Sequence, residues 1–232
     1  MTFTQPLIPG TLLRRYKRFL ADVRLGDGSV VVAHCANTGA MLQVSEPGSR
    51  VMLSQAANPN RKTGYDWQLI EVGGFWTGIN TAVPNRLLRE GFETGTVPEF
   101  RGYERIRMEV PYGVNSRVDA MLTGGCGTCY VEAKNVTLVL EGRALFPDAV
   151  TARGQKHLDE LAAVAKKGDR AVLFLLSQRM DADSMGIAEH IDPEYAARLR
   201  AALAVGIEVV SWRATVSPDG IWLDRALPFV FE

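Results

Sequence analysis

The sequence has few cysteines and no long apolar run. Each of these features limits the classes of protein to which the chain can belong. Three cysteines occur in 232 residues (Cys35, Cys126 and Cys129), too few for a disulfide framework. No run of about 18 apolar residues is present, so no membrane-spanning helix is predicted. The first residues also lack the basic and apolar regions of a signal peptide. We therefore expect a cytoplasmic protein.

An excess of charge of one sign is lacking as well. The chain has 26 Lys and Arg residues and 26 Asp and Glu residues, which argues against a surface dominated by one sign of charge. The charge is unevenly spread, because residues 1–80 contain eight basic and five acidic side chains. Basic groups that would bind a polyanion therefore gather towards the N-terminal end.

The first third of the chain consists of short strand-like segments separated by glycine turns. These segments lie at residues 18–25, 29–35, 50–54, 67–72 and 75–79. Five short strands in so few residues are typical of a small closed barrel. We predict an OB-like barrel over residues 1–80.

From residue 81 onward, helical and strand patterns alternate, and no repeat or low-complexity segment interrupts them. Helices are expected at 84–91, 154–165 and 193–205, and strands at 105–110, 116–122, 130–136, 170–176 and 207–212. A last hairpin is expected around residues 218–220. This order predicts an α+β domain over residues 81–232, with a mixed sheet flanked by helices.

The predicted hairpin of strands 116–122 and 130–136 contains the candidate catalytic and metal-binding side chains. Side chains alternate along a strand, so Glu132 and Lys134 share one face, and the hairpin brings Asp119 to the same face. Two carboxylates suit a hard cation such as Mg²⁺ or Mn²⁺, with the ammonium beside a water or a phosphate. On spacing alone, an ordinary cross-strand salt-bridge ladder explains the same pattern.

Two basic segments carry aromatic side chains among the cations, as nucleic-acid-binding surfaces do. They comprise Arg14, Arg15, Tyr16, Lys17 and Arg18, and then Arg61 and Lys62 with Tyr65 and Trp67 nearby. Contacts to phosphates give affinity without sequence choice, so the partner predicted is DNA bound without sequence specificity. The alternative is a solvated strand end.

Three smaller features remain open or are given ordinary roles. The Cys126/Cys129 pair is interpreted as a chance pair in a turn, because two further zinc ligands are not evident nearby. Gln155 either faces the site or lies in a solvated first helical turn. His157, in the same turn, is interpreted as a surface or packing residue.

Five stretches of the sequence resemble the sugar fermentation stimulation protein A family of bacteria and archaea. They are residues 13–23, 33–39, 115–119, 130–138 and 146–158. The resemblance runs essentially end to end. It implies an OB-like domain followed by a domain of the restriction-endonuclease-like fold, the PD-(D/E)xK nuclease superfamily.

In that superfamily, the residues that match Asp119 and Glu132 bind Mg²⁺, and the lysine that matches Lys134 positions or activates the attacking water. A further acid usually lies on the first helix. Glu90 is the candidate here, with Glu93 and Glu99 left open, and a glutamine at the position of Gln155 occurs in some relatives of the fold. The family implies DNA binding without sequence specificity and a regulatory role in sugar metabolism.

Two hypotheses follow. In the first, the protein is a Mg²⁺-dependent deoxyribonuclease whose barrel holds the strand while the second domain cuts it. In the second, it is a non-catalytic DNA-binding regulator that keeps the nuclease scaffold. Under the first hypothesis, Asp119 and Lys134 are needed for DNA cleavage. Under the second, there is no cleavage, and only the basic segments are needed, for DNA binding.

Overall fold

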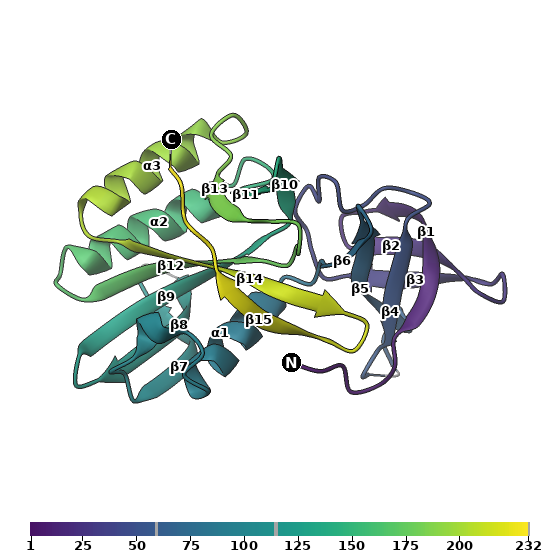
Figure 1. Cartoon of the computed structure of the whole chain (residues 1–232), viewed down its shortest axis with the longest axis horizontal. Helices are drawn as coiled ribbons and strands as arrows, with labels where there is room; N and C mark the ends of the chain where they lie inside the picture. Colours follow the sequence, from purple (N-terminus) through teal and green to yellow (C-terminus); the bar gives the residue numbers. More distant parts are fainter. Residues whose placement is uncertain (59, 114–115, 232) are drawn as a thin grey trace.

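The computed structural model of the chain describes residues 1–58, 60–113 and 116–231. Asn115, which belongs to one of the stretches that carry the family resemblance, lies outside these residues. The structure has an N-terminal β-barrel and a larger domain in which helices flank a sheet, as Figure 1 shows.

The barrel is one six-stranded sheet in the order β3-β2-β1-β4-β5-β6. Its strands are β1 (Ile8–Tyr16), β2 (Leu20–Leu25), β3 (Val30–Cys35), β4 (Arg50–Gln55), β5 (Tyr65–Val72) and β6 (Phe75–Gly78). A parallel pairing of β3 with β5, in which Ala33 lies opposite Tyr65, closes the sheet on itself. Leu12, Val23 and Trp67 fill the interior and are fully buried. The predicted OB-like barrel is confirmed.

One strand of the barrel differs from the prediction. β1 was not foreseen, and Arg18 and Phe19, which belong to the strand predicted at residues 18–25, lie in the turn between β1 and β2. Pro9 and Gly10 lie inside β1, and both residue types are rare in strands. Pro9 and Gly10 therefore make β1 difficult to recognise from the sequence. In the structure, β1 pairs with β2 on one side and with β4 on the other.

The second domain is built on a six-stranded mixed sheet in the order β15-β14-β12-β9-β8-β7. Its helices are α1 (Val83–Glu93), α2 (Ala152–Ala165) and α3 (Pro193–Ala204), with a 3₁₀ turn, η1, at Pro98–Phe100. Its strands are β7 (Arg105–Tyr112), β8 (Ser116–Gly124), β9 (Gly127–Val136), β12 (Arg170–Ser177), β14 (Glu208–Ser217) and β15 (Gly220–Ala226). The predicted mixed sheet with flanking helices is confirmed.

The helices cover opposite faces of this sheet (Figure 1). Leu87 and Leu88 of α1 pack with Val131, Phe174 and other residues on one face. Leu158 of α2 and Leu199 of α3 pack with Leu173 and Leu175 on the other. The apolar run of β12 is buried on both faces, as expected for a central strand.

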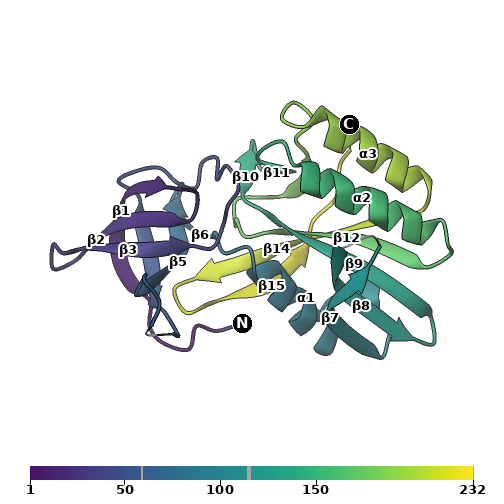
Figure 2. The same cartoon turned by 180° about the vertical axis from the view of Figure 1, so that it is seen from behind.

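A small second sheet, in the order β10-β11-β13, was not predicted. Its strands are β10 (Leu138–Leu140), β11 (Arg143–Phe146) and β13 (Ser184–Ile187). Segments of three or four residues are too short to show the alternation on which strand prediction depends. The view from behind shows β10 and β11 on the side of the domain that faces the barrel (Figure 2).

Buried polar contacts join the two domains. Gln178 is fully buried, and its side-chain amide donates to Asn135 Oδ1 at 2.6 Å and to the Asn80 carbonyl at 3.2 Å. The Met41 N–H donates to Asp148 Oδ2 at 2.7 Å. The bonds from Gln178 to Asn80 and from Met41 to Asp148 connect the barrel side of the junction with the second domain, so specific contacts determine the relative placement of the two domains.

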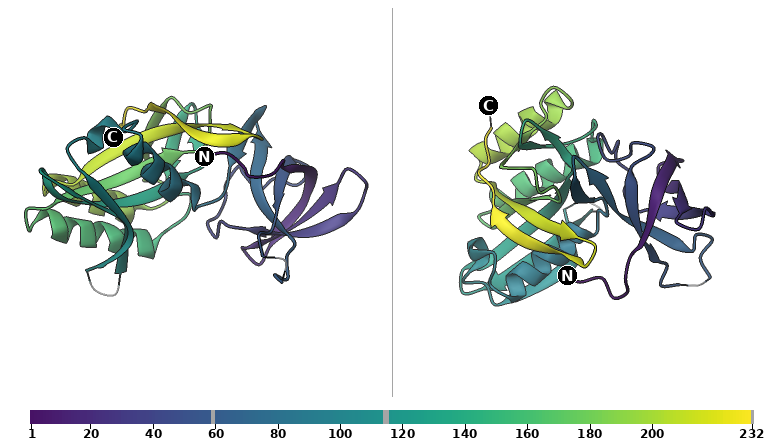
Figure 3. Two further views of the ribbon diagram at one scale, coloured as in Figure 1. Left: turned by 90° about the horizontal axis from the view of Figure 1, so that it is seen from below. Right: turned by 45° about the vertical axis from the view of Figure 1, so that its right-hand side comes forward.

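The chain crosses the domain junction near its start as well. Met1 and Phe3 hydrogen-bond to Ile221 and Asp219 in the β14–β15 hairpin before the chain enters the barrel, which places the N-terminus beside this hairpin in Figure 3. None of the helices in the described ranges is long and apolar enough to cross a membrane.

Candidate active site

The hairpin of β8 and β9 brings Asp119 and Glu132 to the point where the two strands separate. Ala120 lies opposite Val131 in the ladder, and both side chains pack on the α1 face. Alternation therefore directs Glu132 to the opposite face, where His157 of α2 contacts it. Asp119 follows Ala120 directly beyond this last pair of the ladder.

Asp119 lies where the two strands separate. The last main-chain pair of the ladder is Ala120 with Val131, and beyond it Asp119 Oδ2 accepts a hydrogen bond of 2.8 Å from the Ala133 N–H. Asp119 Oδ1 accepts a bond of 2.9 Å from the side-chain amide of Asn85, in the first turn of α1. Two donors from different elements thus fix the carboxylate.

Glu132 is only 2% exposed and is held through one of its oxygens. Lys134 Nζ lies 2.6 Å from Glu132 Oε1, and His157 of α2 contacts the same oxygen through Nδ1. Lys134 Nζ is also 3.3 Å from His157 Nδ1. The other oxygen, Oε2, is buried and has no hydrogen-bond partner, which leaves it available to a water or a cation.

The two carboxyl groups are shifted in opposite directions. Burial, and then the charge of Glu132, raise the pKa of Asp119 above its ordinary value despite the hydrogen bonds that it accepts. Burial also opposes ionisation of Glu132, but Lys134 and His157 outweigh burial, and the pKa of Glu132 lies below its ordinary value. Opposite shifts in neighbouring acids are typical of sites where charge is used chemically.

A groove of about 470 Å³ lies beside Lys134, between the barrel and the second domain. Arg18 lines it from the barrel, and Lys134 and Arg153 line it from the second domain. Asp148, the acid among the described lining residues, already accepts the Met41 N–H. The groove therefore presents three cations to an anionic ligand.

Two family models match the chain on either side of residue 80. The SfsA N-terminal OB domain matches residues 13–79, and the sugar fermentation stimulation protein RE domain matches residues 82–220. The chain belongs to the sugar fermentation stimulation protein (SfsA) family.

Curated relatives and a solved structure agree with this assignment. A sugar fermentation stimulation protein homolog from Pelobacter propionicus is 58% identical over 97% of this chain and 98% of the relative. The homolog from Geobacter sulfurreducens is 56% identical over 98% of each chain. The structure of Pyrococcus furiosus SfsA in complex with Ca²⁺ matches with a TM-score of 0.92 and 28% identity, covering 99% of this chain and 98% of that one. The family resemblance and the fold class are confirmed.

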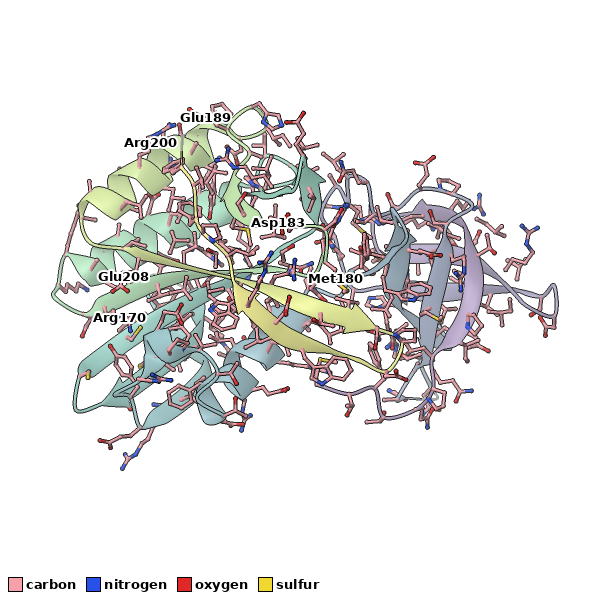
Figure 4. All side chains as sticks on the ribbon, viewed as in Figure 1. Arg170, Met180, Asp183, Glu189, Arg200 and Glu208 are labelled. Atoms are coloured by element: carbon pink, nitrogen blue, oxygen red, sulfur yellow. The ribbon has the colours of Figure 1, made fainter. Side chains whose placement is uncertain are left out.

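Within this SfsA-family chain, the other candidate acids lie away from Asp119. Glu90 forms an ion pair with the main-chain nitrogen of Met1 at 2.9 Å. Glu93 pairs with Arg89 on the exposed face of α1. The Glu99 carbonyl accepts a hydrogen bond from Arg170. The Arg170 guanidinium also pairs with Glu208 at the far end of the sheet, and Figure 4 labels Arg170 and Glu208 there. The side chain that α1 brings to Asp119 is Asn85.

Gln155 is also directed elsewhere. Its side-chain amide donates to both carboxylate oxygens of Asp192, at 3.0 and 3.2 Å, and Asp192 caps the start of α3. His157, one half-turn further along α2, contacts Glu132 and Lys134 instead. The role predicted for His157 is that of a surface or packing residue, without a contact to the acids. His157 follows Gln155 by two residues, about half a helical turn, so the sequence does show that the two side chains lie on different faces of α2. It does not show which of these faces packs against the sheet.

The first basic segment of the barrel is largely engaged in internal contacts. Arg14 Nε and the Tyr16 hydroxyl donate to Asp22, at 2.7 and 2.9 Å. Arg15 donates to the main-chain carbonyls of Arg18, Asn37 and Gly39. Arg18 donates to the Thr38 carbonyl, while Lys17 is exposed.

In the second basic segment, Arg61 forms a two-pronged pair with Asp66, and Lys62 is exposed. Trp67 is fully buried in the barrel, so it is unavailable for stacking. Of the cations in the two basic segments, Lys17, Arg18 and Lys62 are exposed in connections between strands, and Arg14 is exposed on β1, where it pairs with Asp22.

Proposed function

We propose that the protein binds DNA without sequence specificity and hydrolyses its phosphodiester backbone with a divalent cation, Mg²⁺ or Mn²⁺, held by Asp119 and Glu132. The observation that carries this proposal is the orphaned Oε2 of Glu132, which is buried on the sheet face beside Asp119. A buried carboxylate oxygen without a donor is costly unless a water, a cation or a proton occupies it.

The donor set fits a hard cation. Among residues 1–58, 60–113 and 116–231, no group of three or more His, Cys, Asp and Glu side chains is arranged to hold a metal. Mg²⁺ does not need such a cage, because it keeps several waters and binds through one or two carboxylates together with substrate phosphates. The Ca²⁺ in the Pyrococcus furiosus relative supports an oxygen-ligated cation in this family.

The chain's own residues supply the remaining parts of a hydrolytic site. When bound, the cation would polarise the scissile phosphate and neutralise its developing charge. Lys134 is held by Glu132 and lies at the groove, where its ammonium donates to a water or to a phosphate oxygen. Asn85 orients Asp119, and His157 orients Glu132 and Lys134.

The distribution of cations supports a phosphate backbone as the ligand. Arg18, Lys134 and Arg153 face one groove from both domains. Such contacts neutralise phosphates without reading bases, so affinity is expected to fall steeply with salt and to depend little on sequence. Family membership and the RE-domain match support a nucleic-acid substrate.

The test is cleavage of supercoiled plasmid DNA by the purified protein with Mg²⁺, Mn²⁺ or EDTA. We expect nicking with either metal and none with EDTA, and we expect Asp119→Asn, Glu132→Gln and Lys134→Ala to abolish it. Glu93→Gln is the matched control, because it removes an exposed carboxylate that pairs with Arg89 on the same domain. Equal nicking by all variants would indicate a contaminating nuclease and overturn the proposal.

Binding separates the two hypotheses drawn from the sequence. If the wild-type protein binds DNA in EDTA but never cuts it with any divalent metal, the non-catalytic regulator is the correct reading. A link to sugar metabolism, which the family name suggests, would then have to act through binding alone.

A further inference from the structure

The barrel carries an exposed apolar patch bordered on one side by Arg61 and Lys62, away from the groove at Lys134. Phe19 is 47% exposed and Val32 is 40% exposed. They line an open hollow of about 640 Å³ together with Leu20, His34, Arg61 and Lys62. A contiguous apolar patch rimmed by polar residues, unlike a single exposed ring, marks an interaction site.

The position of the hollow in the barrel is informative. Phe19 lies in the turn between β1 and β2, Leu20 and Val32 lie on β2 and β3, and Arg61 and Lys62 lie in the connection between β4 and β5. In barrels of the OB type, the face of the second and third strands and these two connections are where oligonucleotides bind.

The turn that presents Phe19 is fixed in an uncommon conformation. Lys17 and Arg18 have φ values of 49° and 66°, in the left-handed region that residues other than glycine seldom adopt. The Arg18 guanidinium holds the turn by donating to the Thr38 carbonyl at 2.7 and 3.0 Å. Arg15 donates to the Arg18 carbonyl at 2.8 Å. Strain of this kind is retained where a side chain must be presented in a set direction.

The hollow is joined to the candidate active site through this same turn. Phe19 lines the hollow, while its neighbour Arg18 lines the groove that contains Lys134. The hollow and the groove are therefore lined by adjacent residues of one turn.

We propose that Phe19 is a stacking platform for a base of single-stranded DNA, whose backbone lies along Lys62 and Arg18 towards Lys134. The inference rests on the proposed function for its partner, DNA, and adds the form of the DNA. A duplex hides the faces of its bases, so only a single strand or an opened end can stack on the ring. The cations at the rim match the charge of the backbone.

The test is the affinity for a fluorescent oligothymidylate of about 12 nucleotides, a length within the site size of one barrel. Fluorescence anisotropy in EDTA prevents cleavage during the measurement. We expect Phe19→Ala to weaken binding about 5- to 100-fold, as removal of one stacking ring does. Phe19→Trp should retain the affinity, because it keeps a ring. Affinity for a blunt duplex should be the same in all three proteins.

Phe75→Ala is the matched control. Phe75 is 45% exposed at the start of β6, and it does not belong to the residues that line the hollow. We expect its affinity for the oligonucleotide to equal that of the wild type. The proposal is overturned if Phe19→Ala and Phe75→Ala bind alike, or if Phe19→Ala weakens single-strand and duplex binding equally. A change of oligomeric state without a change of affinity in Phe19→Ala would also overturn it.

The outcome is independent of catalysis. The anisotropy assay is performed in EDTA with Asp119, Glu132 and Lys134 unchanged, so its result does not depend on whether the protein cuts DNA. Failure of the nuclease proposal would therefore appear only in the cleavage assay, and failure of the stacking proposal would appear only in the anisotropy of the Phe19 variants.

Discussion

The side-chain amide of Asn85 donates a hydrogen bond of 2.9 Å to Asp119 and so links the first turn of α1 to the strand that carries the acid. The other Asp119 oxygen accepts the Ala133 N–H at 2.8 Å. These two bonds set the direction of the carboxylate, because they reach it from two separate elements. Partners that orient a ligand side chain are often as necessary as the ligand itself.

Loss of this hydrogen bond should impair the metal-dependent reaction more than the fold. We expect Asn85→Ala to lower Mg²⁺-dependent nicking about 10- to 100-fold, the usual effect of removing a residue that orients a metal ligand. A titration of the nicking rate against Mg²⁺ concentration measures it. Arg89→Ala, an exposed change on the same helix, serves as the control. If both variants cut like the wild type, Asn85 does not position Asp119.

The raised pKa of Asp119 predicts that its amide variant is more stable without metal. A carboxyl whose pKa is higher in the folded state destabilises the fold when it is ionised, and this penalty disappears as the pH falls through the folded pKa. In Asp119→Asn, the adjacent Asn85 amide can turn to complement the new side chain. We expect the Tm in EDTA at neutral pH to rise by about 2–4 °C, as ~1 kcal/mol produces in a chain of this size.

Two further measurements check that the rise in Tm comes from the loss of the Asp119 charge. The difference in Tm should shrink as the pH falls towards 3.8, the ordinary pKa of an aspartate, because wild-type Asp119 then becomes neutral. Added Mg²⁺ should raise the Tm of the wild type and leave Asp119→Asn unchanged. A variant that is less stable at every pH would show that the charge of Asp119 supports the fold.

The sequence allowed the strands that hold Asp119, Glu132 and Lys134 to be predicted, because period-two alternation determines which side chains share a face. It also allowed the central position of β12 to be predicted, since a continuous apolar run is typical of a strand covered on both sides. The OB-like barrel followed from the density of short strands and glycine turns. All three depend on local patterns, which a single sequence displays directly.

The helical contributions to the site could not be predicted in the same way. Asn85 and His157 reach the acids because α1 and α2 dock on the sheet at particular rotations, and docking is determined by tertiary packing. Glu90 and Gln155 have equally suitable chemistry, yet they lie on other faces of the same two helices and bind Met1 and Asp192. The exposed position of Phe19 could not be predicted, because the sequence pattern assigned its turn to a strand.

The junction between the two domains has little room for a side chain at Gly78. A Cβ at this position would lie 2.0 Å from Gln178 Oε1 and 2.8 Å from its Cδ. Gln178 would have to move and would lose its bonds to Asn80 and Asn135. We therefore expect Gly78→Ala to lower the free energy of unfolding by about 1–3 kcal/mol, measured by urea denaturation. Gly26→Ala, where a Cβ meets nothing within 4 Å, should change it by less than about 0.5 kcal/mol.

The cysteines of the β8–β9 hairpin should differ in reactivity despite their close spacing. Cys126 is exposed in the turn, whereas Cys129 is buried in β9, where burial raises its thiol pKa to about 12. Burial also raises the pKa of the Cys35 thiol in the barrel. Because the thiolate is the reactive form, we expect a disulfide reagent such as DTNB to modify one thiol rapidly in the native protein and three after denaturation. Cys126→Ser should remove the rapid phase. Two rapid thiols, or protection by added zinc, would indicate that Cys126 and Cys129 act as a pair.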